Sequence, residues 1–310
     1  IVIGRKGNVG SIFYADGPFY CIDTAYYIKK SELKCNIKYF YYLLKTLGLE
    51  KLNEDSAVPG LNRDTAHSQQ FLYPEKIDAQ NRIAEILSAL DDKIELNRQT
   101  NATLEAIAQA IFKEWFVDFN FPGATGELVE SELGLIPEGW RVVQLGEVSD
   151  LSWGDTKTTK NSYSSEGYIA YSASGPDGYL PYYDFSRDGI VVSAIGAYSG
   201  KTWFAHGYWS CIKNTIRFWS TDDNLSNEYL YLYTSPKGFW PLRGSAQPFI
   251  SQTDAREKRI IYPGNHLARY FGEVLQPLFQ LIRRNDDEAF TLSQTRDSLL
   301  PKLMNGEIEV

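Results

Sequence analysis

The most regular feature of the chain is a heptad pattern of apolar positions, which occurs in the middle and again near the C-terminus. Residues recur at alternating steps of four and three over 83–115 and over 271–303. A stripe sustained over several heptads is typical of a long helix that packs against another helix. The first stripe is Ile83, Leu87, Leu90, Ile94, Asn97, Asn101, Leu104, Ala108, Ile111 and Trp115. The second is Phe271, Leu275, Leu278, Ile282, Asn285, Ala289, Leu292, Arg296, Leu299 and Leu303.

Each stripe follows a globular segment, which favours pairing of the two helices with each other in an antiparallel arrangement. Asn97 and Asn285 take equivalent seam positions, where a polar residue costs stability and fixes register. The alternative is that both are exposed or lie at bends. Pro277 inside the second stripe is expected to bend or delay that helix, and Asn305-Gly306 is a helix-stop signal.

The length of the helix pair is also informative. About 35 helical residues span roughly 50 Å at ~1.5 Å per residue. One turn of B-DNA spans roughly 34 Å. Two globules held apart by such a pair have a suitable separation for reading two sites about one turn apart on one duplex.

The segments before the helices have the composition of strands and turns. The runs GIVVSAIG (189–196), NTIRFW (214–219) and KRIIYP (258–263) predict strands. Residues 225–234 predict a helix, and glycine- and proline-bearing stretches between these elements predict loops. We expect an α+β module with a strand-rich core.

An internal repeat relates the two halves of the chain at an offset of 189 residues. Ile1–Ile3 match Ile190–Val192, and Gly7 matches Gly196. After one inserted residue, Gly10, Gly17, Cys21 and Ile22 match, in this order, Gly200, Gly207, Cys211 and Ile212. At the original offset, Ala57 and Pro59 match Ala246 and Pro248, and Tyr73-Pro74 matches Tyr262-Pro263. The helices continue the series after one deletion. An ordered series of this kind indicates a duplicated module. In this register the first copy has no counterpart of about residues 139–189, so the first domain is expected to be N-terminally incomplete.

Composition places the chain among globular proteins. Its 310 residues, 43% hydrophobic and 23% charged, suffice for two domains. Cys21, Cys35 and Cys211 show no CxxC spacing, which favours reduced cytoplasmic thiols over disulfides or a zinc framework. The histidines are scattered, which disfavours a histidine metal site. No apolar run approaches the ~18 residues of a membrane span, and no signal peptide is recognisable.

The net charge of −8 argues, taken whole, against DNA binding. The acidic excess is confined to residues 75–150 and 265–310. Residues 1–74 carry 9 basic against 7 acidic side chains, and residues 151–264 carry 11 against 10. The local charge balance of the two globular parts is therefore compatible with a basic face on each of them. The aromatic content of 14% fits either strand packing or a surface that contacts a polymer.

Three polar loops are candidates for DNA contact. GRKGNVG (4–10) and AIGAYSGK (194–201) follow apolar strands but fit neither the Walker A nor the GxGxxG pattern. WGDTKTTK (153–160) offers small polar side chains and two lysines, suited to phosphates and base edges. The alternative for each loop is a plain solvated turn. The candidate DNA-binding residues are Arg5, Lys6, Asn8, Thr156, Lys157, Thr158, Lys160, Tyr198, Ser199 and Lys201.

No catalytic constellation is recognisable. The sequence contains no P-loop, no HExxH and no NPPY- or DPPY-type methyltransferase motif. Asp91-Asp92-Lys93 mimics part of a nuclease D/E-x-K motif, but it lies on the heptad helix without a preceding strand acid. A stand-alone nuclease or methyltransferase is therefore disfavoured, and no metal or cofactor is expected in the chain.

Three segments carry a resemblance to a known family. They are YPEKIDAQNRIAEILSALDDKIELNRQTNATLEAIAQAIFKEWFVDF (73–119), LGLIPEGWRVVQLGEV (133–148) and TLSQTRDSLLPKLMNGEIEV (291–310). On these segments the chain resembles the specificity subunits of Type I restriction–modification systems along essentially its whole length. Pro74, Asp78 and Gln80 match the start of the family's spacer helix, whereas the second copy matches only at Pro263.

The resemblance implies that two target-recognition domains each read half of a bipartite sequence in double-stranded DNA. It implies that an antiparallel pair of spacer helices sets the half-site distance and that two methylation subunits dock on the helices. Restriction subunits with motor and nuclease activity join for cleavage. S-adenosylmethionine, ATP and Mg²⁺ belong to these partners, so the chain itself is expected to be non-catalytic.

We therefore predict an α+β fold with two β-rich target-recognition domains, the first N-terminally incomplete, separated by two long antiparallel coiled-coil helices. The predicted ranges are 1–74 for the first domain, 75–119 for the central spacer helix, 120–138 for a linker, 139–264 for the second domain and 265–310 for the C-terminal spacer helix. The residues expected to form the coiled coil and the partner-binding helices are Leu87, Leu90, Ile94, Asn97, Leu104, Leu275, Leu278, Ile282, Asn285 and Leu292. The alternative function is a truncated DNA-binding remnant that does not assemble.

Overall fold

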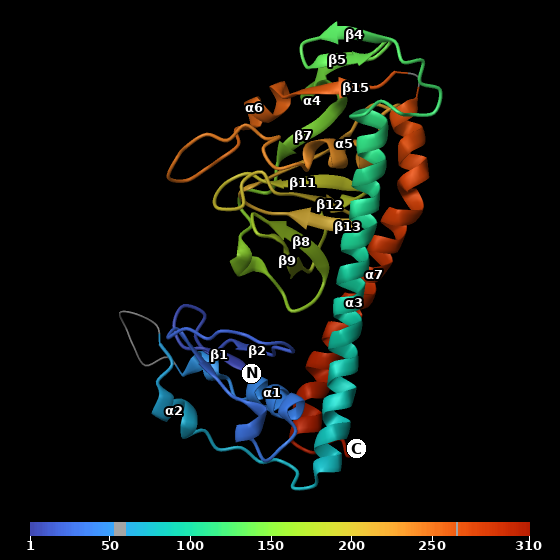
Figure 1. The fold of residues 1–310 in the computed structure, drawn as a ribbon. Helices are drawn as coiled ribbons and strands as arrows, with labels where there is room; N and C mark the ends of the chain where they lie inside the picture. The colour runs from blue at the N-terminus through green and yellow to red at the C-terminus, as the bar shows by residue number, and fades with distance from the viewer. Residues whose placement is uncertain (53–59, 265) are drawn as a thin grey trace. The chain divides into compact units, whose positions relative to one another are not determined.

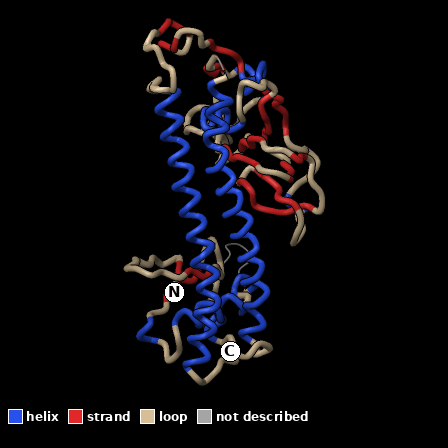
Figure 2. Tube along the Cα trace, turned by 90° about the vertical axis from the view of Figure 1, so that its right-hand side faces the viewer, coloured by secondary structure: helices blue, strands red, loops and turns tan. Residues whose placement is uncertain are grey.

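The computed structural model describes residues 1–52, 60–264 and 266–310. The chain forms two compact units, one of residues 1–101 with 284–310 and one of residues 102–283. Two long helices, α3 (Ile77–Phe116) and α7 (Leu267–Met304), contribute segments to both units (Figure 1). Figure 2 shows the chain coloured by its helices, strands and loops. The repeat positions Ala57 and Pro59 lie outside the described residues.

The second unit is built around two four-stranded sheets. The first has the order β12-β11-β14-β7 and is antiparallel throughout. Its strands are β7 (Ser149–Trp153), β11 (Gly189–Ser193), β12 (Thr202–Ala205) and β14 (Thr215–Ser220). Strand β11 is buried at all five positions, as expected for the central apolar run GIVVS. The strands predicted from GIVVSAIG and NTIRFW are thus confirmed.

The second sheet has the order β10-β13-β8-β9, with β13 parallel to β8. Its strands are β8 (Tyr168–Ser172), β9 (Gly175–Leu180), β10 (Phe185–Ser186) and β13 (Tyr208–Cys211). Two smaller pairs complete the strands of the unit: β6 (Arg141–Gln144) with β15 (Arg259–Tyr262), and β4 (Leu128–Ser131) with β5 (Gly134–Pro137). The pair β4–β5 lies inside the predicted linker, so part of that segment is a hairpin rather than an irregular connection.

Helix α5 (Asn227–Thr234) contacts the first sheet of the second unit through β11, β12 and β14, and helices α4 (Leu145–Val148) and α6 (Gln252–Glu257) contact each other and β7. The Ser226 side chain caps α5 by accepting from the Tyr229 N–H. Tyr229 is fully buried against Phe116 and Phe112 of α3, with ring centroids 4.8 and 5.7 Å away. This aromatic contact makes the helix segments part of the module's own core, and it confirms the helix predicted over 225–234.

The first unit repeats this plan with fewer strands. Its sheet has the order β2-β1-β3, formed by β1 (Val2–Gly4), β2 (Ile12–Phe13) and β3 (Ala25–Tyr27). Helix α1 (Ile37–Thr46) is capped by Asn36 on the Tyr39 N–H, as α5 is capped by Ser226, and a short α2 (Arg63–His67) follows. Among the described residues of this unit, β3 pairs only with β1, and nothing corresponds to the sheet β10-β13-β8-β9.

The heptad positions form the seam between α3 and α7. All twenty predicted stripe positions are buried or partly buried, and none is exposed. The two helices are antiparallel within each unit: Leu87 and Leu303 share one core cluster of the first unit, and Phe112 and Leu275 share one of the second. The predicted pairing of the helices is therefore confirmed, and the chain has the predicted α+β class.

The asparagines of the seam form a buried hydrogen-bond layer in the first unit. The Asn97 Nδ2 donates to the Asn285 carbonyl oxygen at 3.3 Å and to Glu288 Oε2 at 2.9 Å. The Asn285 Nδ2 donates to Asn101 Oδ1 at 2.8 Å, and the Asn101 Nδ2 donates to Asp286 Oδ1 at 2.7 Å. A helix slid by one turn would lose these partners, so the layer favours a single register. The exposed-asparagine alternative is wrong.

Two sequence signals in α7, Pro277 and Asn305-Gly306, have different outcomes in the structure. Helix α7 is assigned without interruption through Pro277, whose ring lies on the exposed face. The expected delay of the helix is therefore not observed. The helix ends at Met304, where the Asn305 N–H bonds to the Pro301 carbonyl and Gly306 adopts a φ of 77°. The predicted stop at Asn305-Gly306 is confirmed.

The asparagine layer predicts a measurable coupling. Asn101→Ala and Asn285→Ala should each lower the free energy of unfolding by about 1–3 kcal/mol, because each leaves a buried polar partner unpaired. Their double variant should show a coupling energy of about 0.5–3 kcal/mol in a chemical-denaturation cycle. Asn161→Ala, at an exposed position, is the control and should change stability by less than about 0.5 kcal/mol. If the two single substitutions lower the free energy of unfolding by amounts that simply add in the double variant, the hydrogen bond between Asn101 and Asn285 does not couple the helices.

Candidate nucleic-acid interface

The predicted DNA-binding loops of the second unit come together at one edge of its first sheet. Because the strands are antiparallel, the end of β7 meets the start of β14, and the end of β11 meets the start of β12. Loops 154–164, 194–201 and 212–214 therefore leave the sheet at the same edge, which we call the loop edge. Figure 1 shows these loops on the side of the second unit that lies away from its α3 and α7 segments.

Backbone hydrogen bonds join the loops of this edge to one another. The Asp155 N–H donates to the Cys211 carbonyl at 2.8 Å, and the Lys213 N–H donates to the Thr158 carbonyl at 3.3 Å. The Ala194 N–H donates to the Asn214 carbonyl at 2.9 Å. Loop 212–214 thus bridges the two loops that the sequence singled out. This bridge was missed, because no motif in residues 212–214 marks it.

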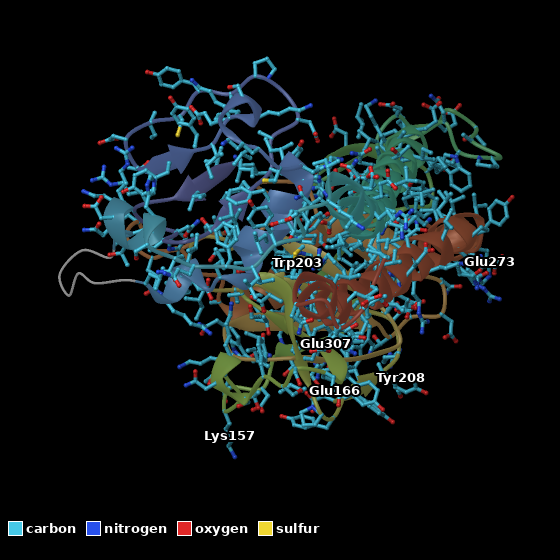
Figure 3. All side chains as sticks on the ribbon, turned by 90° about the horizontal axis from the view of Figure 1, so that it is seen from below. Lys157, Glu166, Trp203, Tyr208, Glu273 and Glu307 are labelled. Atoms are coloured by element: carbon cyan, nitrogen blue, oxygen red, sulfur yellow. The ribbon has the colours of Figure 1, made fainter. Side chains whose placement is uncertain are left out.

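The tip of loop 154–164 is held by Asp155. Its Oδ1 accepts from the Lys157 N–H at 2.9 Å, and its Oδ2 accepts from the Thr158 hydroxyl. These two hydrogen bonds lower the pKa of Asp155, so the turn is held by a carboxylate at neutral pH. Thr156 and Lys157 lie exposed at the tip, and Figure 3 shows the Lys157 side chain projecting away from the ribbon.

Lys160 lies in the same loop but is engaged within the module. Its Nζ contacts Asp177 Oδ2 at 2.5 Å, and Asp177 also accepts from the Tyr163 hydroxyl and from the Ser172 hydroxyl, both at 2.9 Å. Burial opposes ionisation of Asp177, but the hydrogen bonds from Lys160, Tyr163 and Ser172 outweigh it and lower its pKa. This cluster fixes the loop to β9, so Lys160 acts as an internal clamp in this structure.

Two other candidate residues also face inward. Thr158 is buried, and its hydroxyl is committed to Asp155. The Ser199 hydroxyl lies 2.8 Å from the carbonyl oxygens of Gly196 and Pro248 and is half-buried. Both residues shape their loops, and neither presents its hydroxyl outward.

Tyr198 and Lys201 lie exposed on loop 194–201. Tyr198 is 53% exposed, and the Lys201 Nζ lies 5.8 Å from the Tyr198 ring centroid and 5.4 Å from the Trp203 ring centroid. Lys213 is exposed on the neighbouring loop. Together with Lys157, these lysines give the loop edge cations for which no ion pair is recorded among the described residues, although the chain as a whole is acidic.

The candidate residues of the first unit lie on the corresponding loop, between β1 and β2. Arg5 is half-buried: its guanidinium donates to the Asp23 carbonyl at 3.2 Å and lies over the Tyr26 ring. Lys6 and Asn8 are exposed at the tip. The loop therefore presents one cation and one amide outward and anchors a second cation.

The seam residues predicted for the coiled coil are buried or partly buried along α3 and α7, so they pack the helices together. Other apolar side chains point outward. On α7 of the second unit these include Tyr270, Val274 and Leu281, which are 50%, 38% and 40% exposed. The Tyr270 ring stacks on Trp115 of α3, with centroids 5.9 Å apart. This outward surface was not predicted, because heptad counting finds only the seam.

The acidic string on α3 is structural. Asp91 Oδ2 accepts from the Tyr42 hydroxyl at 2.6 Å, and Asp91 Oδ1 accepts from Arg296 of α7 at 2.6 Å. Within residues 1–52, 60–264 and 266–310, no group of three or more His, Cys, Asp and Glu side chains is placed to hold a metal ion. In the same described portion of the chain, no helix combines the length and apolarity of a membrane span.

Comparison with known proteins agrees with the geometry. A protein-family model described as the Type I restriction modification DNA specificity domain matches residues 1–106 and 137–279, which is most of the chain. The MjaIX specificity subunit of Methanocaldococcus jannaschii is 29% identical over 303 residues, covering 88% of this chain and 69% of that protein. The HindI specificity subunit of Haemophilus influenzae is 25% identical, covering 98% and 85%.

A solved structure shares the fold. The S subunit of a Type I restriction–modification system from M. genitalium superposes with a TM-score of 0.54 at 18% identity, covering 98% of this chain and 82% of that one. The first matched segment covers the first module and most of α3, and the second covers the strands of the second module from β6 onward and the first part of α7. The chain therefore belongs to the family of Type I restriction–modification DNA specificity subunits.

Proposed function

We propose that the chain selects the DNA target of a Type I restriction–modification complex by reading a bipartite sequence, one half with each module. The observation that carries the proposal is the loop edge, where backbone hydrogen bonds join the loops that bear Lys157, Lys201 and Lys213. Lysines on such an edge would position the duplex through its phosphates, and exposed tips such as Tyr198 would reach base edges. The first module offers the matching loop with Lys6 and Asn8.

We further propose that two methylation subunits dock on the helices. The outward apolar side chains of α7, among them Tyr270, Val274 and Leu281, support this role, since exposed apolar patches commonly mark protein-binding surfaces. Aromatic residues are also favoured at the centres of interfaces. The stacked Trp115 and Tyr270 would supply such a centre.

The chemistry of the complex is assigned to its other subunits. S-adenosylmethionine, ATP and Mg²⁺ would be bound by the methylation and restriction subunits, and this chain would act without a catalytic group of its own. A methylation subunit must extrude the target adenine from the stack before it can react. The part of this chain would be to hold the correct site in place while that happens.

Co-expression with the neighbouring methylation subunit tests the proposal directly. Single-molecule sequencing of host DNA should find methylated adenines in a motif with two defined halves and a fixed unread gap. A subunit complex should also be recovered by size-exclusion chromatography. A chain that forms no complex, or a complex that methylates no motif, would contradict the proposed role.

Removing lysines from the loop edge should weaken DNA binding in a salt-dependent way. Lys157→Ala combined with Lys213→Ala should reduce the slope of log affinity against log salt by about 1 for each phosphate that the removed lysines neutralise. Fluorescence anisotropy of the complex across a salt series measures this slope. Lys237→Ala is the matched control: Lys237 is an exposed lysine just beyond Ser235, which contacts α3 through Gln109. A slope no different from that of the control would count against the loop edge.

The spacer helices should set the gap in the target. Inserting one heptad into α3 and a matching heptad into α7 adds roughly 10 Å at ~1.5 Å per residue. With DNA rising ~3.4 Å per base pair on each strand, the unread gap should grow by about three base pairs. A seven-residue insertion between Gly123 and Gly126, outside the helices, is the control and should leave the gap unchanged. An unchanged gap in the helix variant would refute the spacer role.

A further inference from the structure

The glycine loops of the two modules, residues 4–11 and 193–201, share one backbone scaffold. The repeat aligns Gly4 with Ser193 and Gly7 with Gly196, and after one inserted residue Asn8 with Tyr198. In this register five backbone hydrogen bonds recur. In the first module they run from Gly4 N to Ser11 O, Gly10 N to Gly4 O, Arg5 N to Thr24 O, Ser11 N to Asn8 O and Leu61 N to Arg5 O. In the second module their counterparts, in the same order, run from Ser193 N to Lys201 O, Gly200 N to Ser193 O, Ala194 N to Asn214 O, Lys201 N to Tyr198 O and Ile250 N to Ala194 O. An isolated bridge recurs as well, Lys6 with Gly60 and Ile195 with Phe249.

Within these two loops, the positions that carry glycine in both modules are those where the backbone adopts a positive φ. Gly7 and Gly196 have φ values of 77° and 106°, and Gly10 and Gly200 have φ values of 74° and 91°. These angles lie in the region that disfavours residues with a Cβ. The duplicated sequence therefore keeps the residues that shape the loop.

The single difference in length is also explained by the scaffold. A Cβ at Gly4 would lie 2.0 Å from the Asn8 carbonyl oxygen, so the shorter loop requires glycine there. The second loop contains the additional Ala197, and Ser193 stands in the place of Gly4. The longer loop thus accommodates a side chain at that position while it keeps the same hydrogen bonds.

The side chains on this shared scaffold differ in chemistry. Asn8 is matched by Tyr198, and both are exposed at the tip. Ser11, whose hydroxyl bonds to the Asn8 carbonyl, is matched by Lys201, which lies over the Tyr198 ring. All five recurring bonds use backbone atoms alone, so these side chains vary without altering the loop.

We propose that the two glycine loops are equivalent base-reading elements, in which Asn8 and Tyr198 determine the bases chosen in the two halves of the target. This inference rests on the proposed function and assigns specificity to one matched position in each module. An asparagine amide pairs with adenine through two hydrogen bonds in the major groove. A tyrosine presents a hydroxyl and an apolar ring instead. Unlike side chains on one scaffold would make the two half-sites differ in sequence.

Exchanging the two residues tests the proposal in the complex with the methylation subunit. Tyr198→Asn should change the preferred base at a position of one half-site, and Asn8→Tyr should change the other half-site. Each variant should favour its former base over the other bases by about tenfold less than the parent does, which is the value of one good side-chain-to-base contact. Sequencing of methylated adenines in host DNA gives the motif for each variant, and the methylation rate on paired oligonucleotides gives the fold-change.

Tyr208→Asn is the matched control, because Tyr208 is also 53% exposed in the second module but lies at the start of β13, labelled in Figure 3. It should leave both half-sites unchanged. Tyr198→Asn and Asn8→Tyr should keep the melting temperature of the parent chain, since both residues lie exposed on loops.

The outcomes separate this inference from the proposed function. If the parent complex methylates a bipartite motif but neither exchange alters a base preference, the inference is overturned and the proposed function stands. A uniform loss of methylation in Tyr198→Asn with the motif unchanged would also overturn it, because that pattern marks a contact to phosphate. If the parent complex methylates nothing, the proposed function itself is refuted.

Discussion

The structure depends on the burial of the heptad seam between α3 and α7. Within each unit the same helix segments that bury this seam also complete the core of a module. Leu87 and Ile83 of α3 share a cluster with Tyr39 and Tyr42 of α1, and Phe116 packs on Tyr229 of α5. The helices are therefore structural parts of both modules. A change of register along the seam would disturb both cores as well as the helix pairing.

The apolar seam stabilises the helix pair, whereas the polar layer sets its register. Apolar contact supplies most of the stability of such a pair, but it tolerates sliding by a heptad. The layer of Asn97, Asn101 and Asn285 is satisfied only in one alignment, because each amide needs a specific partner on the facing helix. Arg296 adds a charged constraint, since it reaches Asp91, which in turn accepts from Tyr42 of the module.

The features that could be predicted from sequence are those that a local pattern encodes. The seam from Ile83 to Trp115 follows from periodicity, and the stop at Gly306 follows from one residue's backbone freedom. The clamp between Lys160 and Asp177 could not be foreseen, because it depends on the pairing of β8 with β9 and on the fold of a separate loop. The same holds for Lys213, which reaches the loop edge only through strand order. Sequence reasoning therefore found the loops but not which of their side chains are engaged internally.

The acidic net charge of the chain is a poor guide to its surface chemistry, because the fold decides which charged side chains are paired internally. Asp155 holds a turn, Asp177 holds Lys160, Asp254 pairs with Arg243, and Asp91 pairs with Arg296. Hydrogen-bond donors around such carboxylates lower the pKa of Asp155, Asp177 and Asp254 and keep them charged, while their charge is met within the fold. The lysines at the loop edge, by contrast, are exposed. A surface for DNA depends on where the unmatched charges lie, and strand order decides that in this fold.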